Sequence, residues 1–293
     1  MASLVPLSYD FSRIKALALD LDGTLLRPDN VLSDLTVNTL RACRDRGLRL
    51  IICTGRSPEA SEAYRAAMGA TGPMVFFNGA EVTDVDERGG RSNTVYALLH
   101  FDVIERCVDI ARKTGVYFQV YFPETSGAGK RLVAERKGAE GDAYFKHTGS
   151  LSAIEDIRET LADAASRAIS GCIKGMFIAD PDTLDEIRPL LAERLGDTVS
   201  LTKTFSAFLE VMPTGVSKGT GLTLALERLS LTGEAVIAAG DEESDISMFA
   251  IAGFSAAPAN AKDHVKAAAH TVIRANTEDG VARFLDQHVL HAG

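Results

Sequence analysis

The feature that most constrains this chain is an alternation of short apolar runs with polar loops and amphipathic segments. Residues 14–19, 48–53 and 74–77 are apolar runs of strand length, and polar residues follow each of them at once. Strands that alternate with helices pair in parallel through right-handed crossovers, and helices then cover both faces of the sheet. The sequence therefore predicts an α/β fold with a Rossmann-like parallel sheet.

The segments between these runs contain the start and stop signals of helices. Ser33 or Asp34 can cap a helix that Gly47 ends. The next helix begins at residues 57–59 (SPE), which supply a cap, a proline at the first helical position and an acid in the first turn. Ligands of such sheets bind at the carboxyl ends of the strands, so the loops after the apolar runs are the expected binding region.

The pattern of elements changes after residue 83 and returns after residue 211. The intervening segment lacks regular alternation, and its predicted strands and helices lie at residues 94–99, 102–113, 116–122, 132–134, 175–178 and from 182 onward. Alternation resumes with a helix over 219–229 and a strand over 235–239. We therefore predict a discontinuous core formed by residues 1–83 and 212–293, with an inserted α+β domain over residues 84–211.

Charge and composition exclude several classes of function. The 293 residues include 31 basic and 40 acidic side chains, which gives a net charge of −9, and no long Lys/Arg run occurs. A broad nucleic-acid or anionic-membrane surface is therefore disfavoured. No apolar run approaches the roughly 18 residues that span a bilayer, and residues 1–10 do not resemble a secretory signal. We expect a cytoplasmic protein without membrane helices.

The four cysteines, Cys43, Cys53, Cys107 and Cys172, are scattered along the chain without a C-x-x-C pair. This spacing argues against a zinc site and against a disulfide framework. We expect all four to be small buried apolar residues.

The strongest local signal is residues 20–24 (DLDGT), which place Asp20 and Asp22 directly after the first apolar run. Crowded carboxylates repel each other, and they persist where a hard cation such as Mg²⁺ neutralises them or where one stays protonated as a general acid. An aspartate after a strand also commonly caps a helix or forms an Asx turn, so this motif alone leaves both interpretations open. Asp241 and Asp245 follow another apolar run and favour a metal site.

Other residues near Asp241 have simpler expected roles. We expect Glu242 and Glu243 to be solvated, because adjacent exposed acids are common. Ser244 can cap the following helix or contact a ligand, and a cap is the more common role of such a serine.

Further polar residues at strand ends suit a phosphate group. Thr54 offers a hydroxyl, Gly55 leaves backbone N–H groups accessible, and the helix that follows directs its positive end toward this loop. Lys218 lies at a helix start, where a lysine is poorly placed unless an anion is near, and an ordinary surface charge is the alternative. Arg56 has the same two interpretations, while Asn78 can form a turn or contact the substrate.

Four of these segments, taken in order, resemble the four motifs of the haloacid dehalogenase-like (HAD) phosphohydrolases: residues 20–25 (DLDGTL), 54–56 (TGR), 218–219 (KG) and 240–245 (GDEESD). The resemblance covers nearly the whole chain. The short gap between the first two motifs leaves no room for a cap domain, whereas the long insertion between the second and third resembles a type IIB cap. Smaller motifs are similar to the Cof-type sugar-phosphate phosphatase branch, namely residues 78–80 (NGA), 209–211 (LEV), 216–219 (VSKG) and 260–261 (NA).

The resemblance implies a mechanism and a metal site. Asp20 would attack phosphorus in line and form an aspartyl-phosphate, while Asp22 would act first as an acid and then as a base. The implied cofactor is Mg²⁺, held by the Asp20 carboxylate, the backbone carbonyl of Asp22, Asp241 and Asp245. Asp245 would bind it directly or through water.

The resemblance also assigns residues to the phosphoryl group. Thr54 and Lys218 would stabilise charge on its oxygens during catalysis, and Gly55, Arg56 and Asn78 would join them in phosphate binding. The sequence departs from the family in two places, since Ser244 stands where an asparagine is common and residues 257–259 (APA) lack the usual glycine.

The implied function is that of a Mg²⁺-dependent phosphatase for small phosphorylated metabolites, such as sugar phosphates or related phosphomonoesters, with specificity residing in the inserted domain. A HAD-type phosphosugar mutase is the nearest alternative, because the four motifs barely separate the two reactions. A sugar-phosphate sensor without turnover is the second, although the intact pair Asp20 and Asp22 argues against it. A Rossmann-type redox enzyme is disfavoured because no G-x-G-x-x-G follows the first apolar run. The sequence does not indicate an oligomeric state.

Overall fold

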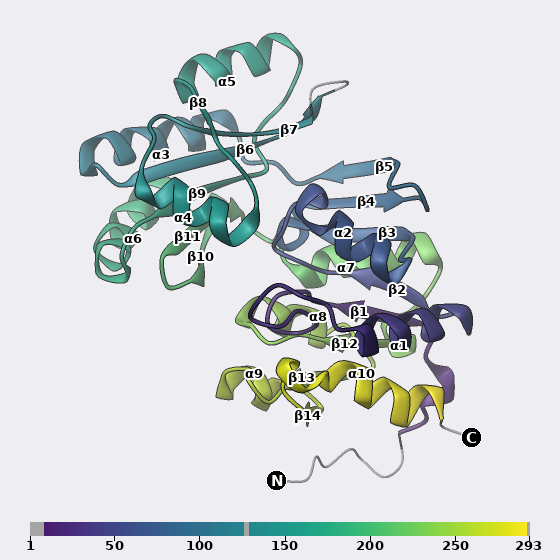
Figure 1. Cartoon of the computed structure of the whole chain (residues 1–293). Helices are drawn as coiled ribbons and strands as arrows, with labels where there is room; N and C mark the ends of the chain where they lie inside the picture. Colours follow the sequence, from purple (N-terminus) through teal and green to yellow (C-terminus); the bar gives the residue numbers. More distant parts are fainter. Residues whose placement is uncertain (1–8, 126–128, 292–293) are drawn as a thin grey trace. The chain divides into compact units, whose positions relative to one another are not determined.

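The structure of this chain is a computed structural model that describes residues 9–125 and 129–291 (Figure 1). The chain divides into two units, one containing Met1–Val95 with Ser217–Gly293 and the other containing Tyr96–Val216. The first unit is discontinuous in sequence and is called the core unit below, and the second is called the inserted unit. The predicted boundaries were 83/84 and 211/212, whereas the units divide at 95/96 and 216/217.

The core unit is built on a five-stranded sheet with the strand order β14-β13-β12-β1-β2. All of its neighbouring strands pair in parallel, as the alternating pattern predicts. The strands are β1 (Ala16–Leu19), β2 (Arg49–Ile52), β12 (Val236–Ala239), β13 (Phe254–Pro258) and β14 (Thr271–Ile273). Every residue of β1 and β12 is buried, because helices cover both faces of a parallel sheet.

The helices of the core unit begin at side-chain caps that the sequence supplies. They are α1 (Asp34–Asp45), α2 (Pro58–Met68), α7 (Lys218–Leu229), α8 (Ile246–Phe249), α9 (Asp263–Ala268) and α10 (Gly280–Leu285). The side chains of Ser33, Ser57 and Ser217 each accept a backbone N–H three residues later, at the starts of α1, α2 and α7. The predicted stop at Gly47 is confirmed, since α1 ends just before this glycine and its φ is +91°.

A second, three-stranded sheet continues the core unit beyond β2. It consists of β3 (Gly72–Phe76), β4 (Glu81–Val85) and β5 (Arg91–Tyr96) in that order. A single parallel bridge between Cys53 and Val75 links the end of β2 to β3. Strand β4 was not predicted, and its antiparallel pairing with β3 keeps residues after position 83 in the core unit.

The inserted unit has a six-stranded sheet with the order β10-β11-β9-β6-β7-β8. Its strands are β6 (Tyr117–Thr125), β7 (Gly129–Ala134), β8 (Ala153–Ile154), β9 (Lys174–Ile178), β10 (Val199–Phe205) and β11 (Phe208–Pro213), and its helices are α3 (Phe101–Thr114), α4 (Ala139–Thr148), α5 (Ile157–Ser166) and α6 (Pro181–Leu195). Apolar residues of α3, α5 and α6 form one core with Phe118, Phe177 and Leu209 of the sheet. The predicted α+β composition agrees with this arrangement.

The cysteines are as the sequence predicts. Cys43, Cys53, Cys107 and Cys172 are free and buried. Burial raises the pKa of the Cys43 thiol to about 11, and it raises the pKa of the other three thiols further still. No helix in the described part of the chain is long and apolar enough to cross a membrane.

The inserted unit also contains a buried ion pair. The ammonium of Lys174 on β9 lies 2.5 Å from Oε1 of Glu210 on β11, and the two side chains are 2% and 3% exposed. Nζ of Lys174 also lies 5.5 Å from the centre of the Tyr121 ring, whose hydroxyl is 3.0 Å from that of Tyr144. Two buried charges are stable here because each lies next to its counter-ion.

Replacing Lys174 with methionine would leave the Glu210 carboxylate buried without its lysine. We expect the free energy of unfolding of the inserted unit to fall by about 3–5 kcal/mol, as is typical when one partner of a buried ion pair is removed. A urea titration followed by circular dichroism measures the change. The matched control is Lys203→Met, because Lys203 pairs at 2.6 Å with the exposed Asp185; its loss should cost less than about 1 kcal/mol. Equal losses in the two variants would contradict this expectation.

Candidate active site

The predicted site residues of the core unit meet at the carboxyl edge of its sheet. Asp20 directly follows β1, and Asp241 follows β12, the strand that pairs with β1 on one side. Thr54 follows β2, which pairs with β1 on the other side. Parallel strands end at the same edge, so these three side chains come from neighbouring strand ends.

Three carboxylates form a cluster at this edge. Asp20, Asp241 and Asp245 each offer an oxygen, and these oxygens lie within 4.8 Å of one another. The three residues are only 4%, 8% and 0% exposed. Oδ2 of Asp245 accepts the backbone N–H groups of Asp241 and Glu242 at 2.9 Å each, and Oδ1 of Asp241 accepts the hydroxyl of Thr24 at 2.9 Å. Neutral donors therefore fix two of the three carboxylates in place.

The buried ammonium of Lys218 connects the cluster. Its Nζ donates to Oδ1 of Asp20 and to Oδ1 of Asp245, both at 2.6 Å. Lys218 is the first residue of α7, where the helix dipole disfavours a cation. The two carboxylates outweigh that effect, so Lys218 is not the ordinary surface charge that the sequence left open.

The electrostatics of the cluster favour an additional cation. Burial raises the pKa of Asp20 well above its usual range, even though Lys218 opposes this shift. Burial, with the Asp245 carboxylate next in importance, raises the pKa of Asp241 to about 7. Burial also disfavours the charged form of Lys218, but Asp20 and Asp245 outweigh this and raise its pKa. One ammonium among three carboxylates leaves negative charge uncompensated.

The donor set fits a hard divalent cation. All of its side-chain donors are carboxylate oxygens, which Mg²⁺ and Ca²⁺ prefer, and no cysteine or histidine belongs to the cluster among the described residues. The loop at Gly23 passes so close that a Cβ there would lie 2.1 Å from Oδ2 of Asp241. The φ of Gly23 is +72°, so both the space and the backbone conformation at this position suit glycine alone.

Asp22 lies beside this cluster and has a different partner. The guanidinium of Arg56 binds both of its oxygens, with Nε 2.7 Å from Oδ2 and Nη2 2.5 Å from Oδ1. Nη2 of Arg56 also donates to Oδ1 of Asn30 at 2.9 Å, and the guanidinium lies 5.2 Å from the centre of the Tyr64 ring. Arg56, predicted as a phosphate ligand, is thus a ligand of Asp22 in this structure. Asn30 and Tyr64 were not anticipated.

The predicted phosphate loop is held by backbone hydrogen bonds. The N–H of Asn78 donates to the carbonyl of Thr54 at 3.0 Å, and the N–H of Phe77 donates to the carbonyl of Arg56 at 3.1 Å. Phe77 and Asn78 adopt positive φ values of +50° and +53° to make these contacts. A Cβ on Gly55 would lie 3.1 Å from the Asn78 side chain. The structure therefore brings Thr54, Gly55 and Asn78 together.

Two contacts that the sequence did not reveal hold the start of α7. A Cβ on Gly79 would lie 2.0 Å from the carbonyl oxygen of Ser217, so the loop after Asn78 passes directly against the helix cap. The hydroxyl of Ser247 accepts the N–H of Gly219 at 3.0 Å and donates to the carbonyl of Ser244 at 2.8 Å. Together these contacts fix the backbone on either side of Lys218.

The neighbours of Asp241 differ partly from expectation. Glu243 is exposed, and Glu242 is 37% exposed and pairs with Lys262 at the surface, so both acids are in contact with solvent as predicted. The expected helix cap at Ser244 is wrong. Ser244 lies inside the 3₁₀ turn Glu243–Asp245, and Glu242 occupies the cap position of that turn instead.

The chain matches the haloacid dehalogenase-like hydrolase family over residues 17–285 and belongs to that family. It is 30% identical over 282 residues to 5-amino-6-(5-phospho-D-ribitylamino)uracil phosphatase YitU of Bacillus subtilis. The alignment covers 93% of this chain and 96% of that protein. The fold, the buried acidic cluster and these relatives together define a phosphoric monoester hydrolase.

Solved structures agree with this assignment. A haloacid dehalogenase-like hydrolase from Bacteroides thetaiotaomicron matches with a TM-score of 0.80 and 26% identity, covering 94% of this chain and 99% of that one. The HAD subclass IIB sugar phosphatase BT4131 has the same fold, with a TM-score of 0.74 and 22% identity over 93% of this chain and 98% of that one. The resemblance to Cof-type proteins with a type IIB cap is therefore confirmed.

Substituting alanine for Gly23 tests how closely the first loop must approach Asp241. We expect Gly23→Ala to lose about 1–2 kcal/mol of stability from its left-handed backbone and to lose at least about 100-fold in phosphate release, because the new methyl group displaces the Asp241 carboxylate. The matched control is Gly47→Ala, whose φ is also positive but whose Cβ would meet nothing within 4 Å. This control should lose similar stability and keep its activity. Equal activities in the two variants, measured as released inorganic phosphate, would contradict the expectation.

Proposed function

We propose that this protein is a Mg²⁺-dependent phosphatase of small phosphorylated metabolites that works through an aspartyl-phosphate at Asp20. The observation that carries the proposal is the ammonium of Lys218, which binds Asp20 and Asp245 at 2.6 Å in a cluster with Asp241. This ammonium orients the buried Asp20 carboxylate and favours its ionised form against the effect of burial, beside a place for a cation. Those are the requirements for a carboxylate nucleophile that attacks an anionic substrate.

Asp20 is the nucleophile in this proposal. Lys218 binds its Oδ1, and among the described residues no hydrogen bond engages its Oδ2. An oxygen of this carboxylate forms the bond to phosphorus while the bond from phosphorus to the leaving-group oxygen breaks. Water then attacks the phosphorus of the aspartyl-phosphate, which releases inorganic phosphate and restores the carboxylate.

Asp22 transfers the proton in both steps. It donates a proton to the departing alkoxide and later accepts one from the attacking water, so it returns to its starting state after each turnover. Arg56 binds both oxygens of this carboxylate. One of these contacts must open before Asp22 can carry a proton, and an arriving phosphate dianion competes for the same guanidinium. Arg56 can therefore bind Asp22 in the free protein and the phosphate when substrate is bound.

Asp20, Asp241 and Asp245 would hold the Mg²⁺ ion, joined by the backbone carbonyl of Asp22. When bound, this cation offsets the repulsion between the anionic nucleophile and the anionic substrate. Thr54 and Lys218 then stabilise charge on the phosphoryl oxygens, and the backbone N–H groups near Gly55 add neutral donors. The positive end of α2, which begins at Pro58, supports the same loop.

We further propose that the inserted unit selects the leaving group. The residues assigned above act only on the phosphoryl group, which all phosphomonoesters share, so discrimination must come from elsewhere in the chain. The relative from Bacillus subtilis is named as the phosphatase of a phosphorylated ribitylaminouracil, a small metabolite. This supports sugar phosphates and related phosphomonoesters as the substrate class.

Release of inorganic phosphate from a panel of hexose, pentose, triose, cofactor and nucleotide monophosphates tests the reaction. We expect Mg²⁺-dependent release by the wild-type protein and a fall of at least about 1,000-fold in Asp20→Asn, because an amide cannot replace the carboxylate nucleophile. Asp10→Asn is the matched control, since Asp10 is exposed, lies outside the site and forms its hydrogen bonds with Ser12. Isomerised sugar phosphate without inorganic phosphate would instead indicate a mutase. Tight binding of sugar phosphate without turnover would indicate a sensor.

Cation binding has its own test, which does not depend on turnover. We expect Mg²⁺ at about 100 times its dissociation constant to stabilise the protein by about 2.7 kcal/mol and to raise the melting temperature by about 5–10 °C over that in EDTA. The Asp241→Asn variant should lose most of this rise, because it lacks one of the three charged ligands. An unchanged melting temperature of the wild-type protein in Mg²⁺ would contradict the metal site.

A further inference from the structure

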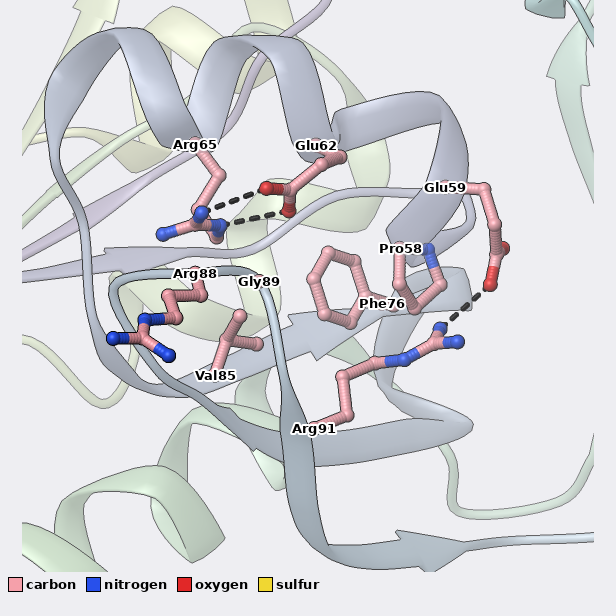
Figure 2. A pocket seen from close by; sticks show the side chains of 9 residues that line it. All are labelled: Pro58, Glu59, Glu62, Arg65, Phe76, Val85, Arg88, Gly89 and Arg91. Carbon is pink, nitrogen blue, oxygen red and sulfur yellow. Dashed lines mark hydrogen bonds and ion pairs between the residues drawn. The ribbon is translucent and has the colours of Figure 1, made fainter. Parts of the chain in front are cut away.

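A cavity lies in the core unit beside α2. Its volume is about 180 Å³, and α2, β3 and the turn between β4 and β5 line it (Figure 2). The floor is apolar, since it consists of Phe76, Val85 and Pro58, and all three residues are buried. None of the residues assigned to catalysis lines this cavity.

The rim of this cavity is charged, with three arginines and two glutamates. Two of the arginines are paired: Arg65 binds both oxygens of Glu62 at 2.7 and 2.8 Å, and Nη1 of Arg91 lies 2.6 Å from Oε1 of Glu59. The third, Arg88, lies exposed in the turn, and its guanidinium has no partner among the described residues. The rim therefore offers one uncommitted positive charge above an apolar floor.

These features define the ligand that fits. Figure 2 shows Arg65 and Arg88 on one side of the Phe76 ring and Arg91 on the other, with Val85 beside Arg88. A cavity of roughly 150 Å³ holds a benzene molecule, so 180 Å³ accommodates one aromatic ring. The single free guanidinium matches a monoanion, whereas the carboxylates of Glu59 and Glu62 disfavour a dianion such as a phosphate monoester.

The position of the cavity links it to the active site through the backbone. Phe76 is the last residue of β3, and the N–H of the next residue, Phe77, donates to the carbonyl of Arg56. Pro58 begins α2 two residues after Arg56. The floor residues Phe76 and Pro58 therefore adjoin the two segments that hold the phosphate loop in place, the one at Phe77 and the one at Arg56. Binding that favours one arrangement of these segments changes the affinity of the loop for its own ligand.

We propose that this cavity is an effector site for a small aromatic monocarboxylate, whose carboxylate binds Arg88 and whose occupancy changes the rate of phosphate release. The binding part of the proposal is independent of the proposed function, and the rate part rests on it. Gly89 is suited to this turn because a Cβ there would lie 2.7 Å from Oε1 of Glu62, and its φ is +81°.

Binding is tested with benzoate and with benzamide, which has a similar ring but no charge. Both are titrated into the Asp20→Asn protein, so that turnover plays no part, and binding is followed by isothermal titration and ligand-detected NMR. We expect Arg88→Gln to weaken benzoate binding about tenfold, the value of one charge-assisted hydrogen bond, and to leave benzamide binding unchanged. Arg49→Gln is the matched control, because Arg49 is equally exposed and unpaired among the described residues but lies outside the cavity. It should leave both ligands unaffected.

The rate is measured as phosphate release by the wild-type protein at saturating benzoate. We expect a change of at least twofold, which disappears in Arg88→Gln, whose basal activity should equal that of the wild type. Absence of benzoate binding, equal weakening in Arg49→Gln, or an unchanged rate with the site occupied would each overturn the proposal. Absence of turnover in every condition would overturn the proposed function instead, and the binding titrations would still decide whether the cavity takes the ligand.

Discussion

The contact between Lys218 and Asp20 is the interaction on which the rest of the site depends. It joins residues 198 positions apart, and both side chains are buried. Without an ammonium at this point, three buried carboxylates would repel one another, and the strand ends that bear them would separate or take up protons. The same contact joins the two segments of the discontinuous core, because Asp20 belongs to the first segment and Lys218 to the second.

Several neighbouring residues hold the backbone at Lys218 in place. Ser217 caps the helix with its side chain, and its carbonyl leaves no room for a side chain at residue 79. The hydroxyl of Ser247 joins the backbone of Gly219 to the turn that bears Asp245. The ammonium is therefore placed by backbone that is fixed on both sides, and little conformational freedom remains to be lost when substrate binds.

The sequence predicts the parallel sheet of the core well, because its strands are short, mostly apolar runs in which nearly every residue is buried. It predicts the strands of the inserted unit less well. Strands β10 and β11 were missed, and β10 includes polar residues such as Ser200 and Thr202 alongside Leu201. Strand β4 (EVTDV) has only two apolar residues among its five and was missed for the same reason. Pairing with a neighbouring strand, rather than apolar content, makes β4 and β10 strands.

Prediction of the site has a similar limit. Strand ends and local motifs locate Asp20, Asp241 and Thr54, since each lies directly after an apolar run. The residues that hold them are set by contacts between distant parts of the chain, and no spacing in the sequence encodes these. Thr24, for example, donates its hydroxyl to the carboxylate of Asp241, which is 217 positions away. Arg56 is a second example. Whether its guanidinium binds Asp22 or a phosphate depends on geometry that only the folded chain provides.

The burial of the four cysteines has a practical consequence for the study of this protein. Their thiols lie inside the two units, and their raised pKa values keep the reactive thiolate scarce at neutral pH. Maleimide and iodoacetamide reagents, which attack thiolates at the surface, therefore react very little with the four native cysteines. A cysteine introduced at any exposed position becomes a selective attachment point for a fluorophore or a spin label, and no native cysteine has to be removed first.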